Sequence, residues 1–138
     1  MKSKRLGAIV LGFLFISPIR AQEPQATGPN PLKVEIKIGT GIANREIVGV
    51  SDSFSSETAE LVCWTYIKGA TEPTDVRHVW SFNNKVVGDA VLQVKSSSYR
   101  TWSRRPVAGR IGEWTLDVKD SEGRVLASKK FTVGQAGR

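Results

Sequence analysis

The chain has 138 residues, 40% of them hydrophobic and 24% charged, and its 20 Lys and Arg residues exceed its 13 Asp and Glu residues. Four of the basic residues and none of the acidic ones fall within residues 1–21, so the 117 residues that follow carry a net charge of only +3. So small an excess does not predict the broad basic stripe expected of a nucleic-acid binder. The single cysteine excludes an internal disulfide, and the length suits one domain with its own core.

Residues 1–21 have the pattern of a secretory signal peptide. Basic residues open the chain, an apolar run spans Leu6 to Ile16, and Ala21 supplies a small residue for cleavage. The run is shorter than the ~20 residues that a membrane-spanning helix needs. We therefore expect an exported protein, periplasmic or extracellular, that touches a membrane only if this leader stays uncleaved.

The next segment, residues 22–31, holds three prolines and a glycine with almost nothing to bury, which predicts a flexible or extended tether. A folded domain is expected over residues 32–134, with a short tail at 135–138. At its start, apolar and charged residues alternate from Val34 to Ile38, which predicts a strand with one wet face. A second, shorter strand is expected over Arg45–Val50, followed by a loop from which Phe54 returns to the core.

The segment Glu60–Ile67 is apolar on both faces, which is typical of a central strand. Cys63 lies within it and is expected to be buried. After turn residues up to Pro73, a strand is predicted to end at Phe82. The Asn83-Asn84 pair tolerates the positive φ angles of a tight hairpin, which returns the chain as a strand with a bulge at Gly88.

The C-terminal part predicts three more strands. The first spans Tyr99–Ser103, and the Arg-rich segment Arg104–Gly112 after it is expected to be a solvated loop. Alternating apolar and polar residues from Trp114 to Val118 predict the second strand. The third strand follows the turn Asp120–Gly123. Leu126 at its start and Phe131 and Val133 at its end are all expected inside, but regular alternation would place Leu126 on the opposite face, which predicts a bulge near Lys129 and Lys130.

These elements predict an all-β protein, an immunoglobulin-like antiparallel β-sandwich of 7–8 strands in two sheets without an internal disulfide. Cys63 and Trp80 correspond in type to the Cys and Trp of an immunoglobulin core, although the second cysteine is missing. A small antiparallel barrel is the alternative.

Several short motifs occur in a characteristic order: Cys63-Trp64, His78-Val79-Trp80, Arg100-Thr101-Trp102-Ser103, Gly112-Glu113-Trp114 and Gly123-Arg124-Val125-Leu126. Together they resemble a family of bacterial envelope domains of unknown function, over about Val34 to Val133. The resemblance implies an envelope location and a β-rich fold, and it implies no catalytic role for any residue.

The sequence gives little sign of an enzyme. His78 is the only histidine, and no nucleophile elbow or Gly-rich oxyanion loop accompanies it. One His and one Cys cannot supply the three or four ligands of a zinc site. Acidic residues such as Asp75 and Glu113 are expected to be solubilising charges. We therefore expect no catalytic residue, no metal and no cofactor.

Binding is the better hypothesis, because aromatic rings beside directional donors suit sugar, peptide or protein recognition. The candidate residues are Trp64, His78, Trp80, Arg100 and Trp102. The leading interpretation is a non-enzymatic interaction domain with an unknown envelope partner, without nucleic acid. The alternative is a glycan-binding domain that uses Trp64, Arg100 and Trp102 as a platform on peptidoglycan or exopolysaccharide.

The same residues also have structural interpretations. Trp80 and Trp114, each flanked by apolar neighbours on its own face, are expected in the core. His78 is expected to bond a backbone carbonyl or Ser103. Arg100 is expected to pair with Glu46 or Asp52.

Overall fold

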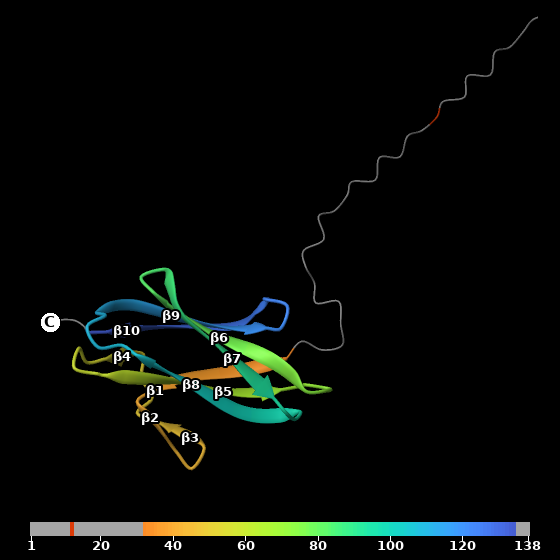
Figure 1. Ribbon diagram of the computed structural model, residues 1–138, viewed down its shortest axis with the longest axis horizontal. Helices are drawn as coiled ribbons and strands as arrows, with labels where there is room; N and C mark the ends of the chain where they lie inside the picture. The colour runs from red at the N-terminus through yellow and green to blue at the C-terminus, as the bar shows by residue number, and fades with distance from the viewer. Residues whose placement is uncertain (1–11, 13–31, 135–138) are drawn as a thin grey trace, which may run out of the picture.

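The computed structural model describes Gly12 and residues 32–134 of the chain. The described part contains no helix, and therefore none that could span a membrane. It contains ten strands (Figure 1): β1 Lys33–Gly39, β2 Gly41–Ala43, β3 Glu46–Val48, β4 Ser53–Phe54, β5 Glu60–Lys68, β6 Thr74–Phe82, β7 Lys85–Val94, β8 Ser98–Pro106, β9 Gly112–Asp120 and β10 Val125–Val133. Except for Gly12, the predicted signal peptide, tether and tail lie outside the described residues.

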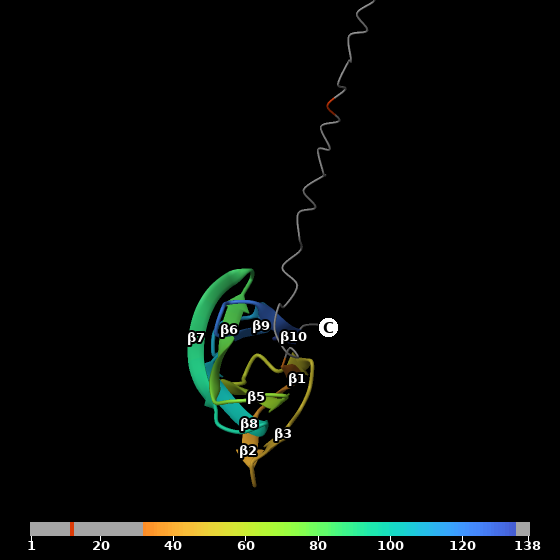
Figure 2. The same cartoon turned by 90° about the vertical axis from the view of Figure 1, so that its right-hand side faces the viewer.

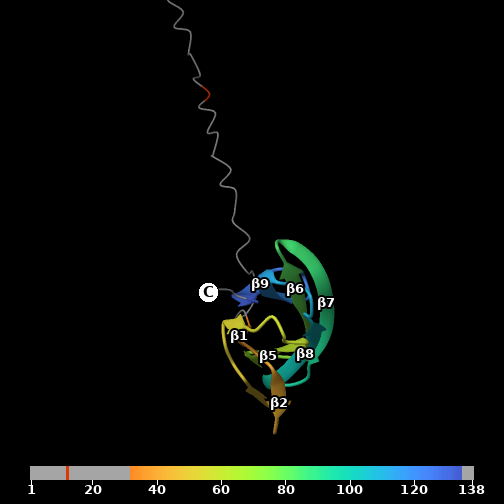
Figure 3. The ribbon, with the colours of Figure 1, turned by 90° about the vertical axis from the view of Figure 1, so that its left-hand side faces the viewer.

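The strands form three sheets. The larger has the order β4-β10-β9-β6-β7, the smaller has the order β1-β5-β8, and β2 and β3 pair as a hairpin. Every pairing is antiparallel except that of β4 with β10. Figures 2 and 3 show β6 and β9 on one side of the core and β5 and β8 on the other, with the β2–β3 hairpin beyond the smaller sheet. The all-β prediction is confirmed for the described residues.

One core fills the space between the two larger sheets. Its buried apolar side chains come from both: Ile38, Leu61, Cys63 and Ile67 from the smaller sheet, and Phe54, Val76, Trp80, Val94, Trp114, Leu116, Val118, Phe131 and Val133 from the larger one. Within it the Trp80 ring packs edge-on against the rings of Trp114 and Phe131, with centroids 6.4 and 6.3 Å apart. The core positions predicted for Trp80, Trp114 and Cys63 are confirmed.

Local signals place most elements correctly. β5 lies between β1 and β8, as its two apolar faces predict. Asn83 and Asn84 have φ angles of 47° and 67° and close the β6–β7 hairpin. The register of that hairpin shifts by one residue at Val87, beside Gly88, so the predicted bulge is confirmed.

Short strands account for the largest error in the strand count. Ten strands in three sheets replace the predicted 7–8 in two, because β2, β3 and β4 have only two or three residues each and leave no periodic pattern. Arg45 was expected to begin a strand. Instead it shares a tight turn with Asn44, at φ angles of 65° and 52° respectively.

Two predictions for the C-terminal part, the end of one strand and the position of a bulge, were also wrong. β8 continues to Pro106 because Arg104 and Arg105 pair with β5, so the predicted loop begins later. The bulge in β10 lies at Leu126 and not near Lys129 and Lys130. A bulge at Leu126 turns that side chain toward the core, on which it packs. Leu126 can therefore lie on the same face as Phe131 and Val133 without a second bulge.

The turn between β9 and β10 is held by the carboxylate of Asp120. It accepts hydrogen bonds from the backbone N–H groups of Glu122 and Arg124 and from Nε of Arg124, at 2.9, 2.9 and 2.7 Å. Burial acts to raise the pKa of Asp120, but these hydrogen bonds outweigh it and lower the pKa below its ordinary value of 3.8. Gly123, with a φ of 87°, completes the predicted turn.

Arg105 links the two sheets where β8 runs beside β7. Its guanidinium donates a hydrogen bond to the backbone carbonyl of Val87, at the bulge, and lies against Gly88. A Cβ at position 88 would come within 2.8 Å of the guanidinium. Gly88 therefore leaves the room that Arg105 needs, and Arg105 satisfies a carbonyl that the bulge removes from regular pairing.

We expect Arg105→Leu to lower the free energy of unfolding by about 2 kcal/mol, because it removes a charge-assisted hydrogen bond between the sheets. Urea unfolding followed by circular dichroism measures the change. The matched control is Arg104→Gln on the same strand, which removes only a half-exposed ion pair with Glu60 and should cost less than about 1 kcal/mol. Equal effects of the two substitutions would contradict this role for Arg105.

Candidate functional site

A hydrogen-bonded network lies inside the core around His78, which is 0% exposed. Its Nδ1 is 2.7 Å from Oγ of Ser103 on β8, and its Nε2 is 3.1 Å from Oγ1 of Thr65 on β5. The indole N–H of Trp80 donates to the same Ser103 oxygen at 3.2 Å. The predicted bond between His78 and Ser103 is confirmed, whereas Thr65 was missed because it is a lone hydroxyl in an apolar strand.

The number of hydroxyl and N–H protons in this network determines which group donates in each hydrogen bond. Thr65 donates its single hydroxyl proton to the backbone carbonyl of Thr101 at 3.2 Å, so it must accept from Nε2–H of His78. Nδ1 is then an acceptor and receives the hydroxyl proton of Ser103, whose oxygen accepts from Trp80. Each donor and acceptor of the network is used once, and His78 is the neutral Nε2–H tautomer.

Charging this imidazole is unfavourable. Burial lowers the pKa of His78 from 6.5 to about 4. Protonation at Nδ1 would also displace the Ser103 proton from its acceptor, leaving that hydroxyl donor without a partner in the network. At neutral pH the ring is therefore a fixed, uncharged structural group, and it has no open position for a substrate.

Aromatic and basic side chains gather on the other side of the smaller sheet. We call this the outer surface: the outward residues of β1, β5 and β8 together with the β2–β3 hairpin. Trp64 on β5 is directly opposite Trp102 on β8, and Tyr66 is directly opposite Arg100. Alternation explains the grouping, because residues 64 and 66 share one face of β5 and residues 100, 102 and 104 share one face of β8.

Cations cover two of these rings. Nζ of Lys37 is 5.2 Å from the centre of the Trp64 ring, and Nζ of Lys68 and Cζ of Arg100 are 4.8 and 5.1 Å from the centre of the Tyr66 ring. Such contacts hold the cationic side chains along the sheet. Nε of Arg100 also lies 3.7 Å from the carboxylate of Glu46 on β3, as predicted.

The hairpin covers Trp64. The indole N–H of Trp64 donates to the backbone carbonyl of Arg45, at the hairpin tip, at 2.9 Å, and the ring is only 2% exposed. Trp102 differs: it is partly exposed, and its indole N–H has no hydrogen-bond partner among the residues that the structure describes. Trp102 is therefore the outward Trp that a ligand can reach.

The five predicted binding residues fall into two separate places. His78 and Trp80 lie in the core network, and Trp64, Arg100 and Trp102 lie on the outer surface. Positions 78 and 80 point to the interior face of the larger sheet, whereas positions 100 and 102 point away from the core. Tyr66, Lys37 and Lys68 join the outer surface, and alternation along β1 and β5 could have identified them.

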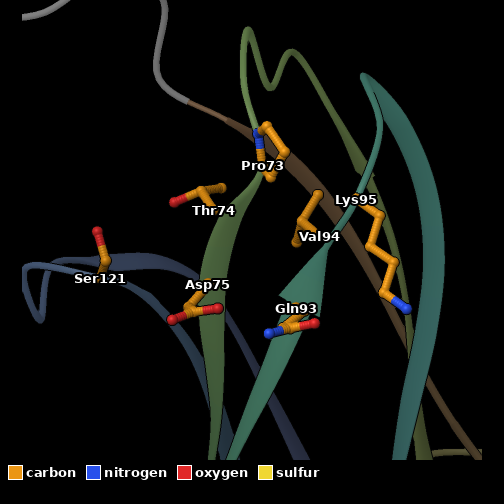
Figure 4. A pocket seen from close by; sticks show the side chains of 7 residues that line it. All are labelled: Pro73, Thr74, Asp75, Gln93, Val94, Lys95 and Ser121. Atoms are coloured by element: carbon orange, nitrogen blue, oxygen red, sulfur yellow. The ribbon is translucent and has the colours of Figure 1, made fainter.

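Outside the core network and the outer surface, the described residues offer little that could serve as a functional site. A shallow pocket of about 310 Å³ lies at one end of the larger sheet (Figure 4), lined by Pro73, Thr74, Asp75, Gln93, Val94, Lys95 and Ser121. In the described part of the chain, no three His, Cys, Asp or Glu side chains lie together as metal ligands would. Burial raises the pKa of the Cys63 thiol well above its ordinary value, which keeps this thiol protonated.

Fold and site together define a small all-β domain with a polar network in its core and an aromatic and basic outer surface. Residues 73–133 match the family described as "Protein of unknown function (DUF2914)". The match covers β6 to β10 and includes His78, Arg100 and Trp102, but not Trp64.

No curated protein matches the sequence. Among solved structures, the chain is similar to a β-glucosidase from Kluyveromyces marxianus, at 12% identity and a TM-score of 0.44. The likeness covers 74% of this chain and only 15% of that enzyme. It is too weak to bear on the fold or the activity of this protein.

Proposed function

We propose that this protein is an exported, non-enzymatic interaction domain with an immunoglobulin-like sandwich fold, and that it binds its partner through the outer surface. Two sheets around one core that holds Cys63 and Trp80 support the fold. The state of His78 supports a non-enzymatic role, because the ring is buried and both its nitrogens are hydrogen-bonded. The partner belongs to the cell envelope.

The observation that carries this proposal is the position of Trp102. It is partly exposed between Arg100 and Arg104, which lie on the same face of β8. A ring flanked by guanidinium groups combines an apolar platform with directional donors. This favours a glycan as the partner over an envelope protein, since a sugar offers an apolar ring face and polar edges together.

Retention on insoluble peptidoglycan tests the glycan partner. We expect the purified domain to sediment with it and Trp102→Ala to lose most of this retention with an unchanged circular dichroism spectrum, because the alanine removes the exposed ring. The control is Val86→Ala, which trims an apolar side chain that is 65% exposed on the larger sheet. If the unaltered domain neither sediments with peptidoglycan nor binds a soluble polysaccharide, a glycan partner is wrong. A protein partner, tested by photo-crosslinking from position 102, then takes its place.

Export is part of the proposal and has its own measurement. The leader pattern predicts cleavage after Ala21, so the mature chain should begin at Gln22. We expect intact-mass spectrometry of the protein recovered from a bacterial envelope fraction to show loss of residues 1–21. Recovery of the full-length chain from the cytoplasm would contradict the proposed location.

A further inference from the structure

The outer surface carries the whole excess of positive charge of residues 32–134. Those residues include 15 Lys and Arg and 12 Asp and Glu, an excess of three. The outer surface holds six of the cations and three of the carboxylates, also an excess of three: Lys33, Lys37, Arg45, Lys68, Arg100 and Arg104 against Glu35, Glu46 and Glu60. The rest of the described domain is neutral, so the face that presents Trp102 is also the face that attracts anions.

These cations are spread along the sheet. Arg100 and Arg104 are four residues apart on one strand, which separates them by about 13 Å. Lys33 and Lys68 are directly opposite each other on β1 and β5, an arrangement of like charges that disfavours the pairing unless an anion lies between them. A single small anion would contact only one of these groups, whereas an extended chain with repeated negative charges contacts several.

The carboxylates on this surface do not hold the arginines firmly. Arg100 is 3.7 Å from Glu46 and Arg104 is 3.4 Å from Glu60, and all four side chains are between 42% and 54% exposed. A good Arg–carboxylate hydrogen bond is about 2.7–2.9 Å long. Exposed pairs of this kind contribute little stability, so a ligand carboxylate can replace them at small cost.

Arg45 adds a second, independent observation. Four residues other than glycine have positive φ angles in the described chain, and three of them are asparagines, which tolerate this conformation. The fourth is Arg45, at the tip of the hairpin that lies on Trp64. The protein closes its β6–β7 hairpin with Asn-Asn and this one with Asn-Arg. Local backbone strain at an exposed cation of the outer surface points to a role for its side chain in binding.

We infer that the outer surface selects an acidic polysaccharide, whose carboxylates are bound by Arg45, Arg100 and Arg104 while a sugar ring packs on Trp102. This rests on the proposed function and adds the chemical class of the ligand. An acidic peptide that adds as a strand is less suited, because both edges of the smaller sheet run beside the larger sheet: β8 beside β7 and β1 beside β10.

Isothermal titration with three soluble polymers tests the inference: polygalacturonate, the neutral polysaccharide dextran, and polyglutamate. We expect polygalacturonate to bind, to bind more weakly as salt rises, and to bind at least tenfold more tightly than either of the others. Arg45→Asn and Arg100→Gln should each weaken binding about tenfold, as loss of a charge-assisted hydrogen bond predicts. Lys130→Gln, on the far side of the larger sheet, should change it less than about twofold.

Arg45→Asn separates binding from folding. It reproduces the Asn-Asn turn that the chain already uses, so its melting temperature should equal or exceed that of the unaltered protein while its affinity falls. Unchanged affinity in both arginine variants, equal binding of polyglutamate, or equal binding of dextran would overturn the inference. Retention on peptidoglycan that depends on Trp102, without binding of polygalacturonate, would overturn only the ligand class and leave the proposed function standing.

Discussion

Replacing Ser103 with alanine is expected to lower the free energy of unfolding by about 3 kcal/mol, although it removes one oxygen atom. Ser103 accepts from the indole of Trp80 and donates to Nδ1 of His78, at 3.2 and 2.7 Å. The alanine leaves both of these buried groups without a partner, and each orphaned group costs about 1–3 kcal/mol. The loss therefore exceeds that of an ordinary hydroxyl.

Urea unfolding followed by circular dichroism measures this difference. Ser98→Ala is the matched control, since Ser98 lies on the same strand, is exposed and points to the outer surface. It should change stability by less than about 0.5 kcal/mol. A loss below about 1 kcal/mol in Ser103→Ala would show that the network is not a major contributor to stability.

Stability is expected to fall by about 3 kcal/mol as the pH drops from 6.5 to 4, because of His78 alone. In this range the unfolded chain binds a proton at His78 that the folded chain does not, since burial lowers the pKa in the folded state from 6.5 to about 4. Stability therefore rises with pH through this window. The contribution is fully present above about pH 6.5 and is lost as the pH falls through about 4.

The comparison with His78→Gln isolates this effect. The substitution lowers stability at every pH, but the step between pH 6.5 and 4 should be absent from its curve. The other buried titratable side chains of the described residues are Cys63 and Asp120, and the buried thiol stays protonated in this range. The depressed pKa of Asp120 adds its own slope only near and below pH 3.8, and equally in both proteins. Parallel curves for the two proteins would refute the assignment.

Local rules predicted much of this molecule. Alternation over Val34–Ile38 and Trp114–Val118 identified strands, and Asn83-Asn84 identified a hairpin, because side-chain direction and φ preference depend on a residue and its nearest neighbours. Alternation also predicted that Arg100 and Trp102 share a face. Even the bond from His78 to Ser103 was predicted, since a buried imidazole needs a polar partner.

The features that local rules did not predict depend on contacts between residues far apart in the chain. Thr65 joined the network only because β5 and β8 place it opposite Thr101 and within reach of His78. The two-residue strand β4 exists because β10 offers it a partner. Trp64 is buried because a hairpin of three-residue strands lies over it, and no periodic pattern announces so short an element.

The sequence by itself thus determined the β-rich class, the main strands and turns, and the split between inward and outward side chains, all of which follow from backbone geometry within a few residues. Only the tertiary structure decided which strands became neighbours, and therefore that His78 and Trp80 lie in a closed core network while Tyr66, Arg100 and Trp102 share an exposed face. Register and sheet packing are set by the sum of many long-range contacts, and no local segment of the sequence contains that sum.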